Sequence, residues 1–467
     1  MRSQAGWVVV LAVLAAGCTD YPGGGSRPPS SVGPTSASPS SSAPLPTSPP
    51  PWVTEDLDDL TTRPLVFAVN ARRPPLDLTT RQADRLQRGA IHRWSQVGQA
   101  GGRLRTTDLS PGLRHLPMDT IAIEVADAMT PALRVATVDG VDPLRDPASY
   151  AVQVQGPAPA PVTTLTVVGD VMLGRGVSGD PLAPMSERLA AADITVGNLE
   201  STLSDDGAPT QGGDSFHASP SVRADLRGAG FDALDLANNH AGDYGDRALE
   251  QTVRLLDAGG LRPFGAGADL AEARAPVVVA RHGIRFGFLG FNAIGETPEA
   301  GPDQPGANAV SMPPRTGPLD RAELDRVLGD VRRLARRVDV VVVLPHWGTQ
   351  YTHRPEPVQH VVARALVRAG ADLVVGGHPH WVQGAEQVGD ALVVHSLGNF
   401  VFDMDFSPQT MEGLVLEATF WGGRLMAADF VPYRMDDDFA PHVVPVTDAG
   451  SVLDPFWAFS SLAAPRR

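Results

Sequence analysis

The chain has 467 residues, of which 42% are hydrophobic, so it is long enough to bury a large core and to form more than one domain. Its 53 acidic and 38 basic residues give a net charge of −15. Proteins that follow nucleic-acid phosphates need clustered positive charge, so this balance argues against a nucleic-acid partner. The sequence contains no lysine, which excludes Schiff-base and Walker-type lysine chemistry.

Residues 1–18 have the pattern of a secretion signal: Arg2 precedes a short apolar run that ends in small residues and is too short for a comfortable membrane span. The single cysteine, Cys18, excludes a disulfide framework within the chain. Residues 14–18, with the sequence LAAGC, resemble a bacterial lipobox. This resemblance implies a lipid-modified Cys18 that anchors the chain to the extracellular face of the cell membrane. The alternative is an ordinary secretion signal with an incidental cysteine.

Residues 19–53 are rich in Pro, Ser, Gly and Thr, a composition that predicts a disordered linker. At about 3 Å per residue, such a spacer reaches up to roughly 100 Å. A small α/β module is predicted at 54–154, with a strand at 65–69 and a helix at 79–87 that Thr79 or Thr80 caps. Segments 78–98 and 135–141 resemble phosphate-type periplasmic substrate-binding proteins. This length is only a fragment of that fold, which implies a supporting or docking module.

A larger α/β domain is predicted at 162–433, followed by a C-terminal tail at 434–467. Short apolar strands alternate with helical segments along it, which predicts a largely parallel sheet with helices on its faces. The predicted strands are 165–168, 194–196, 233–236, 286–289, 338–344, 373–375 and 392–394. The predicted helices are 186–192, 222–229, 246–258, 320–337 and 357–369. Asp320 and Glu323 have capping-box spacing, and Gly230, Gly259 and Gly370 are predicted to end helices.

Polar residues follow the predicted strands. In an open α/β sheet the carboxyl ends of the strands share one edge, so these residues are expected to meet there. Taken singly, a histidine after a strand is more often a hydrogen-bonded structural residue, and Gly-Asp and Asn-Asn are common turn pairs. Their recurrence at one edge predicts a metal site. The most specific motif is His378-Pro379-His380, because residues two apart in an extended segment project the same way. Carboxylates and imidazoles suit Zn, Mn, Fe or Mg.

These motifs resemble those of the calcineurin-like metallophosphoesterases. They resemble even more closely those of the bacterial capsule-synthesis CapA family, which is associated with poly-γ-glutamate. The motifs that carry the resemblance are GDVMLGR (169–175), NLE (198–200), LANNH (236–240), HWG (346–348), GHPH (377–380) and SLGNFVFD (396–403). The resemblance implies a layered metallophosphatase-like α/β domain that holds one or two divalent ions. The implied metal ligands are Asp170, Glu200, Asn239, His346, His378 and His380.

The resemblance further implies that Glu200 bridges two ions and that His240 is a proton donor beside them. His395 would assist with protons, and Arg175 would meet an anionic group of the substrate. Two residues depart from the phosphoesterase pattern. Met172 stands where those enzymes have a histidine, and Glu200 replaces their bridging aspartate. The first ion would therefore have fewer protein ligands, so a one-metal site is an alternative to a two-metal mechanism.

Two functions are compatible with these observations. The first is a surface-tethered metal-dependent hydrolase or transferase that acts on a phosphoester or on an amide of a polyglutamate-like polymer. The second is a non-catalytic export, retention or assembly factor that binds an anionic polymer such as poly-γ-glutamate. In both cases the expected partners are the polymer, the capsule synthesis machinery and, through the lipid anchor, the membrane.

Overall fold

The structure is a computed structural model that describes residues 61–108 and 116–462. The predicted signal, Cys18 and the linker lie outside the described residues. Within the two described ranges, no helix combines the length and the apolar character needed to cross a membrane.

Residues 62–155 form a small mixed sheet with one α-helix. The five-stranded sheet has the order β3-β4-β1-β5, with β7 also paired to β1, and a separate pair joins β2 and β6. The strands are β1 (Thr62–Asn70), β2 (Asp77–Leu78), β3 (Arg105–Thr107), β4 (Thr120–Val125), β5 (Leu133–Val135), β6 (Thr137–Val138) and β7 (Gln153–Gln155). Helix α1 (Thr80–Gln87) starts at the predicted cap Thr79, which forms a capping box with Gln82.

The rest of the described chain is built on two large sheets. The eight-stranded sheet has the order β13-β12-β9-β8-β23-β24-β25, with β22 also paired to β8. Its strands are β8 (Val162–Val171), β9 (Ile194–Leu199), β12 (Ala233–Asp235), β13 (Arg262–Phe264), β22 (Asn399–Val401), β23 (Glu412–Trp421), β24 (Arg424–Met435) and β25 (Pro441–Val443). The six-stranded sheet has the order β15-β16-β18-β19-β21-β20. Its strands are β15 (Val277–Arg281), β16 (Ile284–Asn292), β18 (Val340–His346), β19 (Leu373–Val375), β20 (Val382–Val388) and β21 (Ala391–Leu397).

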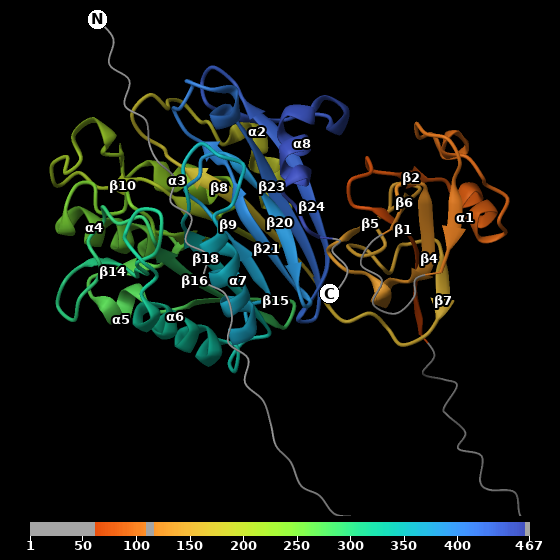
Figure 1. The fold of residues 1–467 in the computed structure, drawn as a ribbon, viewed down its shortest axis with the longest axis horizontal. Coiled ribbons are helices and arrows are strands. Elements are labelled where there is room, and N and C mark those ends of the chain that lie inside the picture. Colours follow the sequence, from red (N-terminus) through yellow and green to blue (C-terminus); the bar gives the residue numbers. More distant parts are fainter. Residues whose placement is uncertain (1–60, 109–115, 463–467) are drawn as a thin grey trace, which may run out of the picture. The chain divides into compact units, whose positions relative to one another are not determined.

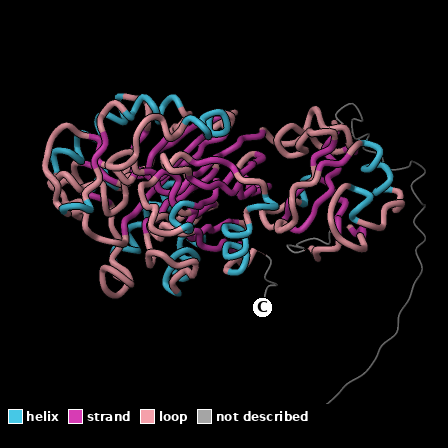
Figure 2. Tube along the Cα trace, turned by 90° about the horizontal axis from the view of Figure 1, so that it is seen from above, coloured by secondary structure: helices cyan, strands magenta, loops and turns pink. Residues whose placement is uncertain are grey.

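The two sheets pack face to face, with helices on their outer faces. One apolar core combines side chains of both sheets, such as Val167, Val196, Phe288 and Val342. A second core joins the eight-stranded sheet to α2 (Ala183–Ala190), α3 (Val222–Gly228) and α4 (Asp246–Ala258). A third joins the six-stranded sheet to α6 (Arg321–Leu334) and α7 (Pro357–Ala369). Figures 1 and 2 show the strands gathered inside and the helices around them. The layered α/β architecture is thus confirmed.

The prediction of parallel strands holds for the centre of each sheet and is wrong at the sides. β13, β12, β9 and β8 are parallel, as are β16, β18, β19 and β21. Antiparallel strands extend each sheet: β23 to β25 on one, and β15 and β20 on the other. The turn between β23 and β24 contains Gly422 and Gly423, a pair typical of hairpins.

Two helices allow the predicted start and end signals to be compared with the structure. Helix α7 has the predicted bounds and ends at Gly370, whose φ of 113° is in the left-handed region. Helix α6 begins after Asp320, whose side chain accepts hydrogen bonds from the backbone N–H groups of Ala322 and Glu323. The capping box is only half formed, because the Glu323 carboxylate accepts from the backbone of Ser311 instead.

The remaining elements are short or C-terminal. They are β10 (Thr202–Leu203), β11 (His217–Ala218), β14 (Ala266–Gly267), β17 (Gly306–Ala307), α5 (Leu270–Ala273) and α8 (Gly450–Ala458). The segment predicted as a tail includes the end of β24, β25 and α8, and Val452 and Phe456 of α8 join the core between the sheets. Amphipathic packing of this kind depends on a nearby apolar surface, which the short apolar run around 452–456 does not reveal by itself.

Candidate metal centre

The predicted metal ligands lie together where the carboxyl ends of the two parallel strand sets meet. Asp170 lies near the end of β8, Glu200 follows β9 and Asn239 follows β12, all in the eight-stranded sheet. His346 ends β18, and His378 and His380 follow β19, in the six-stranded sheet. All six side chains are at most 2% exposed. The site is therefore built by two packed sheets and not by one open sheet as predicted.

Asn198 links the first carboxylates to the histidines. Its Nδ2 donates to Asp170 Oδ1 at 2.8 Å and lies 3.3 Å from Glu200 Oε1. The same nitrogen is 3.3 Å from His346 Nδ1. The other oxygen of Asp170 accepts from the backbone N–H of His378 at 3.1 Å. Residues separated by up to 208 positions are thereby held in one polar cluster.

Glu200, Asn239 and His346 converge on one point. His346 Nε2 lies 2.8 Å from Glu200 Oε1 and 2.8 Å from Asn239 Oδ1. The second oxygen of Glu200, Oε2, is buried and has no hydrogen-bond partner among the described residues. A buried carboxylate oxygen without a donor is costly unless a cation or a water satisfies it.

The GHPH segment adds two strained histidines. His378 and His380 have positive φ angles of 92° and 57°, which are uncommon for residues other than glycine and cluster at functional sites. Both ring nitrogens of His378 are buried and have no hydrogen-bond partner in the described chain. His380 Nδ1 lies 2.8 Å from Asn399 Oδ1 and 3.7 Å from Asp170 Oδ2. Gly377 allows this approach, because a Cβ there would lie 2.6 Å from Asp170 Oδ1.

These donors fit a divalent ion. Asp170, Glu200 and His380 each offer an atom within 4.8 Å of the others. The unpartnered Glu200 Oε2 and His378 nitrogens supply further buried lone pairs beside them. Carboxylate, amide and imidazole donors without a thiol suit Zn, Mn, Fe or Mg, and the donor set does not select one of them.

Burial shifts the pKa values of these groups in the direction that favours their neutral forms. It raises the pKa of Asp170 to about 7, with a further contribution from the charge of Glu200, and it raises the pKa of Glu200. It lowers the pKa of His346 to about 3 and holds the pKa of His378 well below its ordinary value. Neutral imidazoles are the form that binds metals, and a bound cation would favour the carboxylate anions.

His240 lies beside the predicted ligands in a supported position. Its Nδ1 is 2.9 Å from Asp243 Oδ2, and its Nε2 is 2.8 Å from Asn239 Nδ2. The ring stacks on Phe216 with 3.8 Å between centroids. Asp243 therefore orients the imidazole, as a carboxylate does for a catalytic histidine.

Arg175 and Met172 both pack against Phe216, the ring that stacks on His240. The Arg175 guanidinium is 4.2 Å from the Phe216 ring centre and forms an ion pair with Asp403. Its charge is therefore already compensated. Met172 is fully buried in an apolar cluster with Phe216 and Phe402, and its sulfur accepts from the backbone N–H of Gly174.

His395 belongs to a different cluster. Its Nε2 is 3.4 Å from Glu386 Oε1, and its ring lies 4.5 Å from that of His360 between centroids. His395 follows Val394 on β21, and Val394 packs between the sheets, so alternation turns His395 toward α7. The structure therefore does not bring His395 together with the six predicted ligands.

Two residues that contribute to the site had no predicted role. Asn198 contacts Asp170, Glu200 and His346, and it stands two residues before Glu200 within the NLE motif. Asp243 follows His240 by three residues, a spacing that places two side chains on one face of a turn. An amide in the motif and a carboxylate close to a histidine are signals that sequence inspection can use.

Comparison with known proteins identifies the family of the chain. Residues 164–404 match the model of the family described as "Bacterial capsule synthesis protein PGA_cap". The chain is 31% identical over 303 residues to "Capsule biosynthesis protein CapA" of Bacillus anthracis, covering 62% of this chain and 71% of that protein. It is 30% identical over 266 residues to "PGA biosynthesis protein CapA" of Bacillus subtilis, covering 54% and 67%.

A solved structure of a 5′-nucleotidase from Candida albicans is weakly similar, with 11% identity and a TM-score of 0.36, covering 62% of this chain and 57% of that chain. A hypothetical protein from Thermus thermophilus has 16% identity and a TM-score of 0.38, covering 58% and 99%. The family assignment rests on the sequence matches. The chain belongs to the PGA_cap family of bacterial capsule synthesis proteins.

Proposed function

We propose that this chain acts in capsule or poly-γ-glutamate synthesis as a metal-dependent hydrolase of a phosphoester or of a γ-glutamyl amide. The observation that carries the proposal is the convergence of six buried donor residues, with Glu200 Oε2 and both His378 nitrogens left without hydrogen-bond partners among the described residues. The names of the CapA relatives support the polymer class. A divalent ion bound at these donors supplies Lewis-acid polarisation and acidifies a water molecule.

The residues around the donors supply the remaining parts of a hydrolytic site. Asp243 holds the His240 ring beside the donors, and we assign His240 as the proton donor to the leaving group. Burial of the donors excludes bulk water, which strengthens each electrostatic interaction there. Arg175, which Asp403 holds through an ion pair, remains the proposed contact for an anionic group of the substrate.

The proposal is tested by metal analysis of the full chain and by hydrolysis of a p-nitrophenyl phosphodiester and a γ-glutamyl anilide. We expect bound metal and metal-dependent turnover of one of the two substrates, and we expect His378→Ala to lower the amount of bound metal and to abolish turnover. His442→Ala is the matched control, since His442 is an exposed histidine paired with Asp436, and it should retain both. Stoichiometric metal without turnover of either substrate would reject the hydrolase and favour polymer binding. Met172→His should raise the metal content, because it restores the histidine ligand that the phosphoesterase pattern gives to the first of the two ions.

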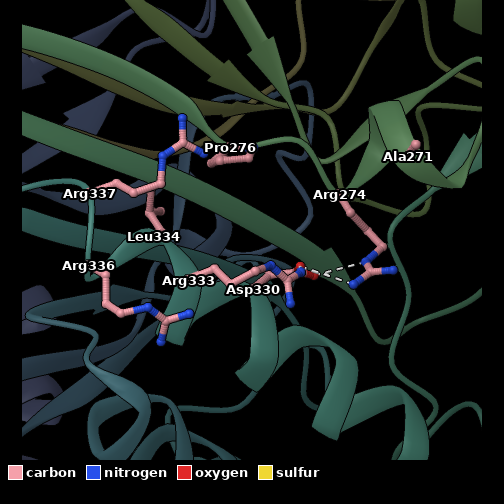
Figure 3. Close-up of a pocket in the computed structure, with 8 residues that line it drawn as sticks. All are labelled: Ala271, Arg274, Pro276, Asp330, Arg333, Leu334, Arg336 and Arg337. Carbon is pink, nitrogen blue, oxygen red and sulfur yellow. Dashed lines mark hydrogen bonds and ion pairs between the residues drawn. The ribbon is translucent and has the colours of Figure 1, made fainter.

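A second candidate function, binding of an anionic polymer without cleavage, is favoured by an arginine-lined pocket (Figure 3). The pocket has a volume of about 520 Å³ and lies between α5 and the end of α6. It is lined by Ala271, Arg274, Pro276, Asp330, Arg333, Leu334, Arg336 and Arg337. Asp330 pairs with Arg274 and Arg333. Arg336 and Arg337 are exposed, and their side chains have no ion-pair partner among the described residues.

Replacing Arg336 and Arg337 together with glutamine is expected to weaken binding of labelled poly-γ-glutamate roughly fivefold at low salt, since each exposed ion pair contributes up to about 1 kcal/mol. The difference should shrink as salt screens the charges. Arg332→Gln is the control, because Arg332 is an exposed arginine near the end of α6 that does not line the pocket. Fluorescence anisotropy measures the affinity. Equal weakening by Arg332→Gln would show a general charge effect and no pocket.

The proposed location is the extracellular face of the cell membrane, where acylated Cys18 tethers the chain. The lipobox-like residues and the Pro/Ser-rich spacer support this location. Cys18→Ser, which cannot be acylated, should move from the membrane fraction to the culture medium. Retention of this variant in the membrane fraction would contradict the anchor.

A further inference from the structure

A second group of metal-binding side chains lies away from the centre described above. It consists of His360 on α7, Glu386 on β20 and His395 on β21. The three residues come from three different elements, and none of them is among the six donors of the first centre. We propose that His360, Glu386 and His395 form a separate zinc site that joins α7 to the six-stranded sheet.

The separations between donor atoms fit a tetrahedral ion. His360 Nδ1 is 2.9 Å and His395 Nε2 is 3.4 Å from Glu386 Oε1, and the three donor atoms lie within 4.8 Å of one another. Two ligand atoms that are each about 2.0–2.1 Å from a tetrahedral zinc are roughly 3.3 Å apart. The site therefore needs only small side-chain adjustments to accept zinc.

His395 gives independent support for a ligand at this place. Its side chain is 1% exposed, and neither ring nitrogen has a hydrogen-bond partner among the described residues. A buried polar atom without a partner is costly, and coordination of one nitrogen by zinc removes part of that cost. The ring is held in place by packing near Trp347, with 6.0 Å between centroids.

The surroundings of Glu386 are those of a metal-bound carboxylate. Glu386 is 4% exposed, and its second oxygen, Oε2, is 3.2 Å from an Arg364 nitrogen. An ion on Oε1 and an arginine on Oε2 would use both oxygens, as hydrogen-bonded carboxylate ligands commonly do. Two imidazoles and one carboxylate form a ligand set typical of zinc with an open fourth position.

His360 lies between the cluster and solvent. The His360 side chain is 33% exposed and contributes to a surface pocket of about 620 Å³. The pocket also contains residues of the loop before α7, such as Thr352 and Glu356. Zinc can therefore enter from solvent, and a water molecule can complete its coordination.

The test measures zinc in the full chain with the first centre disabled by Glu200→Gln. We expect this variant to retain about one equivalent of zinc after dialysis, and we expect the additional change His360→Gln or His395→Gln to remove it. His360 is partly exposed, so its variant should fold, which circular dichroism checks. The added change His442→Gln, at an exposed histidine, should leave zinc unchanged. Cobalt substituted for zinc should give the intense visible absorption of a tetrahedral site, and His360→Gln should abolish it.

The proposal is overturned if Glu200→Gln binds no zinc. It is also overturned if adding His360→Gln or His395→Gln to that variant leaves the amount of bound zinc unchanged. Its failure is distinguishable from failure of the proposed hydrolase. A wild-type chain without turnover leaves the zinc measurement unaffected. Conversely, His360→Gln should leave metal-dependent turnover intact, because His360 is not part of the first centre.

Discussion

Replacing Glu200 with glutamine is expected to lower the affinity for a divalent ion at the first centre by about 100-fold or more, since the change removes a charged ligand and not only its support. Glu200 is fully buried, and its Oε1 already lies 2.8 Å from His346 Nε2. Glutamine has nearly the same shape as glutamate, so the loss of metal affinity would come from the missing charge and the weaker oxygen ligand. Metal titration by calorimetry, analysed for two classes of site, measures the change.

The matched control for Glu200→Gln is Glu417→Gln. Glu417 is also a buried glutamate, but it pairs with Arg145 and Arg188 and contributes nothing to the donor cluster. This control should lose stability, because Arg145 and Arg188 lose their ion pairs with Glu417, while it retains metal at the first centre. Metal binding by Glu200→Gln with wild-type affinity would reject the assignment of this residue as a ligand.

Replacing Gly169 with alanine is expected to destabilise the fold by about 3 kcal/mol and to weaken metal binding together with it. A Cβ at position 169 would lie 1.9 Å from the carbonyl oxygen of Gly398. That carbonyl cannot move freely, because it accepts the backbone N–H of Asp170 at 3.1 Å. The clash would therefore displace Asp170 itself. Urea unfolding of the full chain and metal titration measure the two effects.

Gly228→Ala is the control for the glycine prediction. Gly228 is the exposed last residue of α3, and a Cβ there meets no atom within 4 Å. Alanine favours helix by up to about 1 kcal/mol over glycine, so this variant should be unchanged or slightly more stable. An unfolding midpoint of Gly169→Ala equal to that of the wild type would show that β8 and the Gly398 turn can separate without cost.

Local patterns account for the part of the fold that was predicted well. Helix α7 was predicted with its observed bounds because Pro357 marks its start and Gly370 its end. The parallel strands β8, β9 and β18 were found because each is a short apolar run between turns. Strands β23 and β24 were missed although Gly422 and Gly423 mark the hairpin between them. The motif after each strand likewise marked the six donors of the first centre, which are Asp170, Glu200, Asn239, His346, His378 and His380.

His395 shows the limit of such motifs. It follows a strand in sequence, like His346 and His378, and its position alone placed it at the same edge. Its direction depends on which face of β21 packs between the sheets, and Val394 occupies that face. His395 therefore turns toward Glu386 and His360, a cluster with no counterpart in the motifs. Tertiary packing decides which face of the sheet a strand residue lies on, and no short stretch of sequence around His395 encodes that choice.

The sequence by itself determined the family, the central parallel strands with the helices between them, and the residues that follow those strands, because hydrophobic period, helix caps and turn residues act over a few positions. Only the tertiary structure decided that two sheets supply the first centre, that Asn198 and Asp243 support it, and that Gly169 must lack a side chain. Those features depend on contacts between residues up to 229 positions apart, as between Gly169 and Gly398. Such contacts exist only once both sheets have packed.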